Sequence, residues 1–157
     1  MEAQYPLFEA IGPVSGSVIR NDVRTGDAAE AFVIAKLLKW GYDAHDTRRD
    51  LPYDVVVDVG VGLICRIQVK GRGRADNGIW PFRAQRGNWR SATGTYAYAK
   101  ADFDISAFVA LSIEKVLFVT GILPTFKAAT ADFLRAGAEQ ESWERALQAF
   151  QTKNRAA

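Results

Sequence analysis

Apolar and polar residues alternate along two neighbouring stretches in the middle of the chain, residues 53–59 and 63–70. The alternation has the two-residue period of a strand, and Gly60 and Gly62 between the stretches are typical of a turn, so we predict two paired strands. One face carries the apolar side chains, namely Val55, Val57, Val59, Leu63, Cys65, Ile67 and Val69. The opposite face gathers Asp54, Gln68 and Lys70 on rigid backbone.

Residues 27–40 have the apolar spacing of an amphipathic helix. Asp27 suits the N-cap of this helix, and Gly41 suits the position just after its end. Glu30 falls in the first turn, where it either completes a capping box with Asp27 or offers a carboxylate to a functional site. The spacing alone leaves both roles open.

The remaining periodic segments extend the same picture. Residues 42–47 predict a strand, and residues 105–112 and 115–120 predict a hairpin whose first arm is nearly all apolar, as expected of a buried strand. Residues 125–153 predict helix with a break near Gly137. We therefore predict an α/β fold, in which helices flank a mixed β-sheet.

The chain divides on this pattern into three parts. Residues 1–21 are broken by proline and glycine and form an N-terminal arm to which we assign no role. Residues 22–124 form the core, and residues 125–157 form a C-terminal helical segment. This last segment has more large apolar residues than one small sheet needs, which predicts a homodimer or a higher homo-oligomer.

Composition narrows the class of protein. A chain of 157 residues with 48% apolar content fits one globular domain. The single cysteine and single histidine exclude an internal disulfide and a Cys/His zinc site, and no apolar run is long enough to cross a membrane. His45 is expected to be structural or solvent-facing. Without a signal-like start, we expect an intracellular, cytoplasmic protein.

Positive charge is concentrated in one part of the chain. The net charge is only +2, yet residues 66–100 contain eight basic residues and a single acidic one. A concentration of this kind is typical of a surface that binds the phosphate backbone of a nucleic acid. The candidate DNA contacts are Arg66, Arg72, Arg74, Arg86 and Arg90.

Aromatic residues are interleaved with these basic ones. Trp80, Phe82 and Trp89 could add groove contacts to the phosphate contacts. Alternatively, they anchor the segment to the core, which we favour for Trp80 and Phe82.

The polar face of the two central strands suggests a chemistry. A carboxylate from Asp54, an amide oxygen from Gln68 and an ammonium from Lys70 are suited to holding a divalent cation beside a phosphate. The sequence around them, Tyr-Asp-Val-Val-Val-Asp, a glycine turn and Arg-Ile-Gln-Val-Lys, resembles the PD-(D/E)XK nuclease superfamily. It is most similar to the branch that has Gln in the last motif, which includes an intron-encoded homing endonuclease. Archaeal-type Holliday junction resolvases are similar but more distant.

This resemblance extends over about residues 26–123 and departs from the superfamily pattern at two positions. Tyr53 replaces the proline of the motif, and Gln68 replaces its second acidic residue. The second difference removes one anionic metal ligand, which Glu30 would compensate.

The resemblance implies a restriction-endonuclease-like fold and Mg²⁺-dependent hydrolysis of DNA phosphodiester bonds, with Mn²⁺ as a possible substitute. Asp54 would be the central metal ligand, and Glu30, Gln68 and the carbonyl oxygen of Val69 would complete the set. Lys70 would orient or deprotonate the attacking water and stabilise charge in the transition state. These roles favour Glu30 as a site residue over Glu30 as a helix cap.

Two alternatives share the fold. One is a structure-specific nuclease resembling Holliday junction resolvases, and the other is a catalytically inactive DNA-binding module, for which Gln68 is the best argument. A homing or restriction-like endonuclease remains the primary prediction. A small domain cuts one strand at each site, so a double-strand cut would require at least a dimer.

Overall fold

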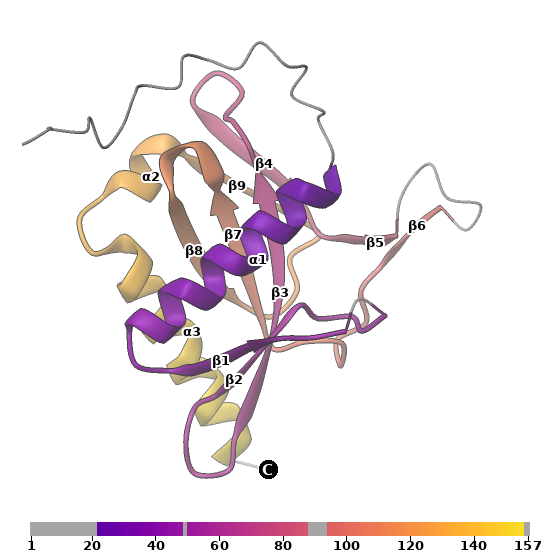
Figure 1. Ribbon diagram of the computed structural model, residues 1–157, viewed down its shortest axis with the longest axis vertical. Helices are drawn as coiled ribbons and strands as arrows, with labels where there is room; N and C mark the ends of the chain where they lie inside the picture. The colour runs from indigo at the N-terminus through magenta and orange to yellow at the C-terminus, as the bar shows by residue number, and fades with distance from the viewer. Residues whose placement is uncertain (1–21, 49, 88–93, 156–157) are drawn as a thin grey trace, which may run out of the picture.

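The computed structural model describes residues 22–48, 50–87 and 94–155 (Figure 1). The arm predicted over residues 1–21 and the predicted DNA contact Arg90 lie outside these ranges. No helix in the described part of the chain is long and apolar enough to cross a membrane.

A five-stranded sheet forms the centre of the molecule (Figure 1). Its strand order is β1-β2-β3-β7-β8, with bounds β1 Asp43–Asp46, β2 Val55–Asp58, β3 Ile64–Arg72, β7 Ile105–Ala110 and β8 Lys115–Thr120. β3 and β7 run parallel, and the other pairs are antiparallel, so the sheet is mixed. The predicted α/β class, the two central strands and the hairpin are confirmed.

Helices α1 (Asp22–Lys39) and α3 (Ala138–Arg155) pack on one face of this sheet and form its main core. The strand residues that face them are the predicted ones: Val55, Val57, Cys65, Ile67 and Val69 are all buried. Val55 pairs with Ile67 and Val57 with Cys65. Because strand side chains alternate, this register directs the intervening polar residues to the other face.

A second core covers the other face of β7 and β8. β4 (Ile79–Arg83) pairs with β9 (Thr125–Ala129), and the short helix α2 (Thr130–Leu134) follows directly. Trp80, Phe82 and Phe133 are buried in this core. The anchoring role favoured for Trp80 and Phe82 is therefore confirmed. β5 (Gln85–Gly87) and β6 (Thr95–Ala97) form a separate two-stranded hairpin that projects from the sheet (Figure 1).

The C-terminal segment differs from the prediction at its beginning. Residues 125–129 were expected to be helical, but they form β9, because polar Thr125 and Lys127 alternate with Phe126 and Ala128 beside the free edge of β4. The break at Gly137 is confirmed, since this residue has a φ of 76° between α2 and α3. β9 also joins this segment to the core through its pairing with β4, and the division at residue 124 stays a prediction.

The apolar residues of α3 are used within the chain. Trp143, Leu147 and Phe150 are buried against the sheet. These apolar residues, which suggested a homodimer, are therefore covered within one molecule. Oligomerisation stays a prediction, but the apolar residues of α3 no longer support it.

Helix α1 begins five residues earlier than predicted. Asp27 is an interior residue of a helix that starts at Asp22, and helical structure continues through Gly26. Asp27 is therefore not the N-cap, and a capping box between Asp27 and Glu30 is excluded. The sequence signal failed because a glycine inside a helix costs only about 1 kcal/mol, which tertiary packing can outweigh.

The packing that outweighs it is a close approach of α1 to β3. A Cβ atom placed on Gly71 would lie 2.5 Å from the Cβ of Ala29 and 3.0 Å from the backbone oxygen of Thr25. Only glycine leaves room for the helix at this point. The approach fixes the first turns of α1, including Glu30, against the strand that carries Gln68 and Lys70.

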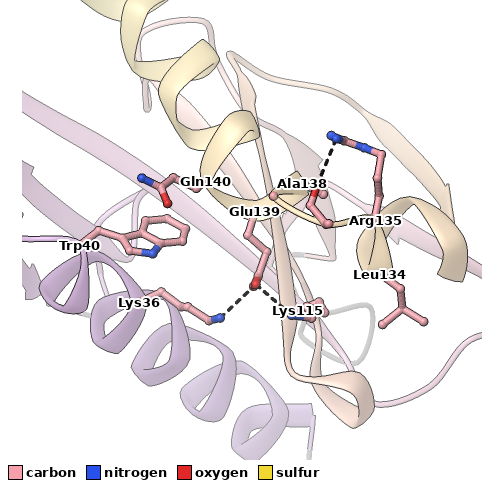
Figure 2. Close-up of a pocket in the computed structure, with 10 residues that line it drawn as sticks. Lys36, Trp40, Lys115, Leu134, Arg135, Ala138, Glu139 and Gln140 are labelled. Atoms are coloured by element: carbon pink, nitrogen blue, oxygen red, sulfur yellow. Dashed lines mark hydrogen bonds and ion pairs between the residues drawn. The ribbon is translucent and has the colours of Figure 1, made fainter.

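A charge cluster fixes α1 nearer its other end. Glu139 of α3 accepts hydrogen bonds from Lys36 of α1 at 3.0 Å and from Lys115 of β8 at 3.2 Å, and also from the backbone N–H of Val116 at 3.1 Å. Figure 2 shows the Glu139 carboxylate between the two lysines at the edge of a pocket of about 220 Å³. We interpret this cluster as structural.

We predict that Gly71→Ala destabilises the protein by about 1–3 kcal/mol, because the added methyl group forces α1 away from β3. Gly73→Ala is the matched control, since no atom lies within 4 Å of a Cβ at that position. This control should be neutral or slightly stabilising. Chemical denaturation measures both, and equal stability of the two variants would contradict a tight contact at Gly71.

Candidate active site

Asp54 directly precedes the first residue of β2, at the point where β3 continues beyond this partner strand. Its backbone N–H donates to the carbonyl of Ile67 at 2.9 Å, although Ile67 is already the register partner of Val55, so the regular antiparallel pairing ends here. Beyond this point β3 has no β2 partner. The Asp54 carboxylate fills the gap by accepting a hydrogen bond from the backbone N–H of Val69 at 2.7 Å.

The amide of Gln68 lies directly beside this carboxylate. Gln68 is only 5% exposed, and its Nε2 donates to Oδ2 of Asp54 and, at 3.2 Å, to the carbonyl oxygen of Val69. The Asp54 carboxylate and the Val69 carbonyl, which the sequence predicts as metal ligands, thus both accept a hydrogen bond from the NH₂ group of Gln68. The same amide also has an oxygen that can serve as a ligand.

Lys70 is half-buried at the same end of the sheet. Its Nζ donates to the hydroxyl of Tyr98 at 3.1 Å and to the carbonyl of Gln85 at 3.3 Å. It also lies 5.3 Å from the centre of the Tyr98 ring. Asp54, Gln68 and Lys70 are therefore gathered as their alternation along the strands predicted.

Burial shifts the pKa of both charged groups of the site, Asp54 and Lys70. Desolvation raises the pKa of Asp54, although the hydrogen bond from Val69, the charge of Lys70 and the hydrogen bond from Gln68 oppose the rise. Desolvation also lowers the pKa of Lys70, against the attraction of Asp54 and Glu30. The folded protein thus favours the neutral form of each group more than water does.

Glu30 belongs to the same electrostatic environment. The charge of its carboxylate, like that of Asp54, opposes the lowering of the Lys70 pKa by burial, although Glu30 lies on a helix and Lys70 on a strand. Among the residues that the structure describes, no three side chains of the His, Cys, Asp and Glu types cluster together. The hard oxygen donors predicted from the sequence, namely the carboxylates of Asp54 and Glu30 and the amide of Gln68, fit Mg²⁺ better than a soft metal.

Arg66 has a different environment from the other predicted DNA contacts. Its guanidinium donates to Asp104 at 3.0 and 3.1 Å and to the carbonyl of Ala101 at 2.8 Å. Asp104 also accepts from the backbone N–H of Arg66 at 2.9 Å. These bonds fix residues 101–104 to β3, and we therefore give Arg66 a structural role and omit it from the proposed DNA surface.

A pocket of about 440 Å³ lies beside Lys70. Its lining includes Arg72 and Arg83, while Arg72 is held by Asp76 at 2.7 Å and by the carbonyls of Arg74 and Pro81. Arg83 is one of the eight basic residues in the segment 66–100, but it was not predicted as a DNA contact. The pocket extends the positive surface up to the candidate site.

The other predicted contacts lie on exposed or undescribed parts of the chain. Arg74 is exposed in the loop after β3. Arg86 belongs to β5, but its side chain is outside the described set, as is all of Arg90. His45 is exposed and pairs with Asp43 at 2.9 Å, which agrees with the solvent-facing position expected for it.

Comparison with known proteins identifies the class. A family model described as PD-(D/E)XK endonuclease matches residues 20–149, and the chain therefore belongs to this family. The structure is similar to a solved structure titled as a bacterial homing endonuclease, I-Ssp6803I, with a TM-score of 0.67 and 21% sequence identity. The match covers 88% of this chain and 99% of the other, and it confirms the restriction-endonuclease-like fold. No curated protein matches the chain significantly.

The first functional prediction follows from the raised pKa of Asp54. Because folding favours its protonated form, the ionised carboxylate destabilises the protein at neutral pH, and this penalty disappears as the pH falls through the raised pKa towards the ordinary value of 3.8. In metal-free buffer, Asp54→Asn should therefore raise the melting temperature at pH 7, and the gain should shrink on acidification.

Asp46→Asn is the control, because it removes an exposed carboxylate from the neighbouring strand β1. Thermal unfolding in chelator from pH 7 down to pH 4 measures both variants. A lower melting temperature for Asp54→Asn at pH 7 would contradict the desolvation argument.

Proposed function

We propose that this protein is a divalent-metal-dependent DNA endonuclease that hydrolyses phosphodiester bonds. The proposal rests mainly on the partly buried cluster of Asp54, Gln68 and Lys70, held on adjacent strands of a fold that belongs to an endonuclease family. A structural ion pair would need neither the amide bonded to its carboxylate nor the open pocket beside its ammonium. These features support catalysis over a binding role alone.

Asp54, Glu30, Gln68 and the carbonyl of Val69 would hold the metal ion. Mg²⁺ is the proposed ion and Mn²⁺ a substitute, since nucleases of this family generally use divalent metals. When bound, the ion would polarise the scissile phosphate and stabilise the charge that develops on it. The neutral amide of Gln68 keeps the site to two carboxylate charges, which limits repulsion with the anionic substrate.

Lys70 is proposed to orient the attacking water and to assist its deprotonation. Its lowered pKa makes the neutral amine easier to reach near neutral pH, and the protonated form can stabilise negative charge in the transition state. Asp54 keeps the ammonium beside the site through its opposite charge.

DNA would approach over the positive surface next to Lys70. Arg83 of β4 lines the pocket, Arg74 is exposed in the preceding loop, and Arg72 lies between them. Arg86 and Arg90 remain proposed contacts from the sequence. These arginines would contact phosphates and thereby position the duplex rather than read its bases.

A homing or restriction-like activity on duplex DNA is the finer proposal. The similar solved structure is titled as a homing endonuclease, which supports this class. A cut through both strands would require two copies of the site, so we propose that the protein acts as a homodimer or a higher homo-oligomer.

Cleavage assays on linear duplex, single-stranded DNA and four-way junctions, with and without Mg²⁺, test the proposed endonuclease activity. Activity confined to junctions would favour a resolvase instead.

We predict that Asp54→Ala, Lys70→Ala and Glu30→Ala each reduce cleavage by at least about 100-fold while DNA binding persists, because each removes a group proposed to act on the reacting phosphate. Asp58→Ala and Lys100→Ala are controls that remove the same charges from exposed positions. Single-turnover cleavage and mobility-shift assays measure the two properties. Wild-type turnover in Glu30→Ala would show that α1 supplies no ligand.

Two substitutions at Gln68 complete this test. Gln68→Ala removes the ligand oxygen and should cripple cleavage, whereas Gln68→Glu should retain cleavage with an altered dependence on Mg²⁺ concentration. If the wild-type protein is silent and only Gln68→Glu cuts, the natural protein is a DNA-binding module and the proposed enzyme activity is wrong.

The positive surface gives a separate prediction. Replacing both Arg74 and Arg83 with Gln should lower the slope of log K against log salt by about two units, because each arginine is expected to neutralise one phosphate. A double Gln variant of Lys153 and Arg155, in the last turn of α3, removes the same charge elsewhere. Fluorescence anisotropy at several salt concentrations measures the slopes. An equal change in both double variants would mean that only the net charge matters.

A further inference from the structure

We propose that Tyr98 is a positioning residue for the nuclease reaction, whose hydroxyl holds the ammonium of Lys70 at the end of β3. The inference rests on the proposed function, because it assigns Lys70 its part in hydrolysis. It adds a residue that the motif of the central strands does not contain.

The contacts of Lys70 support this role. A lysine side chain is long and flexible, so the acceptors around its ammonium decide where the charge lies. The Tyr98 hydroxyl accepts from Nζ at 3.1 Å, and the ring of Tyr98 lies 5.3 Å from Nζ, within the range of a cation–π contact. The carbonyl of Gln85 is a second acceptor at 3.3 Å. Tyr98 thus contributes both polar and aromatic contacts to one ammonium.

Tyr98 is itself firmly placed. Its ring packs edge-on against Phe103 with centroids 5.1 Å apart, and Phe103 is only 2% exposed. The backbone between them is closed by two hydrogen bonds, from Ala99 N–H to the Asp102 carboxylate at 2.7 Å and from Asp102 N–H to the Ala99 carbonyl at 2.9 Å. The hydroxyl therefore has a fixed position against which a flexible side chain can be held.

The same segment is tied to the strand that carries Lys70. Asp104 donates its backbone N–H to the carbonyl of Arg66 at 2.9 Å, and its carboxylate pairs with the Arg66 guanidinium. Arg66 and Lys70 lie four residues apart on β3. The Arg66–Asp104 pair therefore fixes the segment that presents Tyr98, which gives this arginine an indirect part in the site.

Two carboxylates and one hydroxyl act on the Lys70 ammonium, and they come from three different parts of the chain. Asp54 precedes β2, Glu30 belongs to α1, and Tyr98 follows β6. The two carboxylates attract the ammonium towards the proposed metal ligands, whereas Tyr98 and Gln85 hold it through their own oxygens. Without the hydroxyl, the ammonium should shift towards the carboxylates and lose its alignment with the attacking water.

Tyr98→Phe is the test, because it removes the hydroxyl and keeps the ring that packs on Phe103. We expect kcat to fall by about tenfold, as for the loss of one hydrogen bond to a charged group, with KM for DNA and the melting temperature unchanged. Tyr96→Phe is the control, since it removes another hydroxyl from the adjacent strand β6. Unchanged kcat in Tyr98→Phe, or an equal loss in both variants, would overturn the proposal.

A second measurement requires no cleavage. In NMR spectra of protein labelled with ¹³C-lysine, the two Hε protons of Lys70 should give separate signals because the side chain is held in one position. Comparison with Lys70→Met assigns these signals. The two signals should merge in Tyr98→Phe and stay distinct in Tyr96→Phe. Signals that remain distinct in Tyr98→Phe would overturn the positioning role. A silent wild-type enzyme with signals that merge as expected would instead refute the proposed function and leave the contact established.

Discussion

The close approach of α1 to β3 at Gly71 is the constraint on which the site depends. A missing Cβ lets the backbone of the helix come within contact of the strand, next to the residue that carries the ammonium of the site. One glycine therefore brings a carboxylate from a helix into the field of a lysine on a strand. The charge cluster around Glu139 holds the same helix further along, so α1 cannot easily tilt away.

The site that results lowers the stability of the fold. Burial disfavours the ionised form of Asp54 and also that of Lys70, so the fold is less stable than it would be with neutral groups at these positions. Such a cost is typical of functional sites, where groups are held ready for a ligand rather than for stability. A cation that meets two carboxylates, an amide and a backbone carbonyl would relieve part of it.

Much of this arrangement could be predicted from the sequence. Alternation over residues 53–59 and 63–70 identified the strands and the shared face of Asp54, Gln68 and Lys70, because a two-residue period allows only one assignment of faces. The start of α1 could not be predicted, since Gly26 suggests a helix end unless the packing at Gly71 is known. β9 was missed because a five-residue strand looks like part of the helix that follows when its partner strand is unknown.

The contacts of Arg66 and Tyr98 were beyond sequence reasoning for another reason. Arg66 is part of a basic segment, and only the fold reveals that Asp104, thirty-eight residues later, neutralises it. Tyr98 belongs to no recognisable motif, and its contact with Lys70 depends on the segment that leads into β7, which starts opposite Ile67 and runs parallel to β3. Long-range pairing decides both roles.

We propose above all that Asp54, Glu30, Gln68 and the carbonyl of Val69 hold a divalent cation beside Lys70. Anomalous diffraction from crystals grown with Mn²⁺ and a DNA duplex is the decisive experiment. We expect an anomalous peak within coordination distance of the Asp54 carboxylate and the carbonyl oxygen of Val69. A peak bound only at other residues, or no peak at saturating Mn²⁺ with DNA in place, would contradict it.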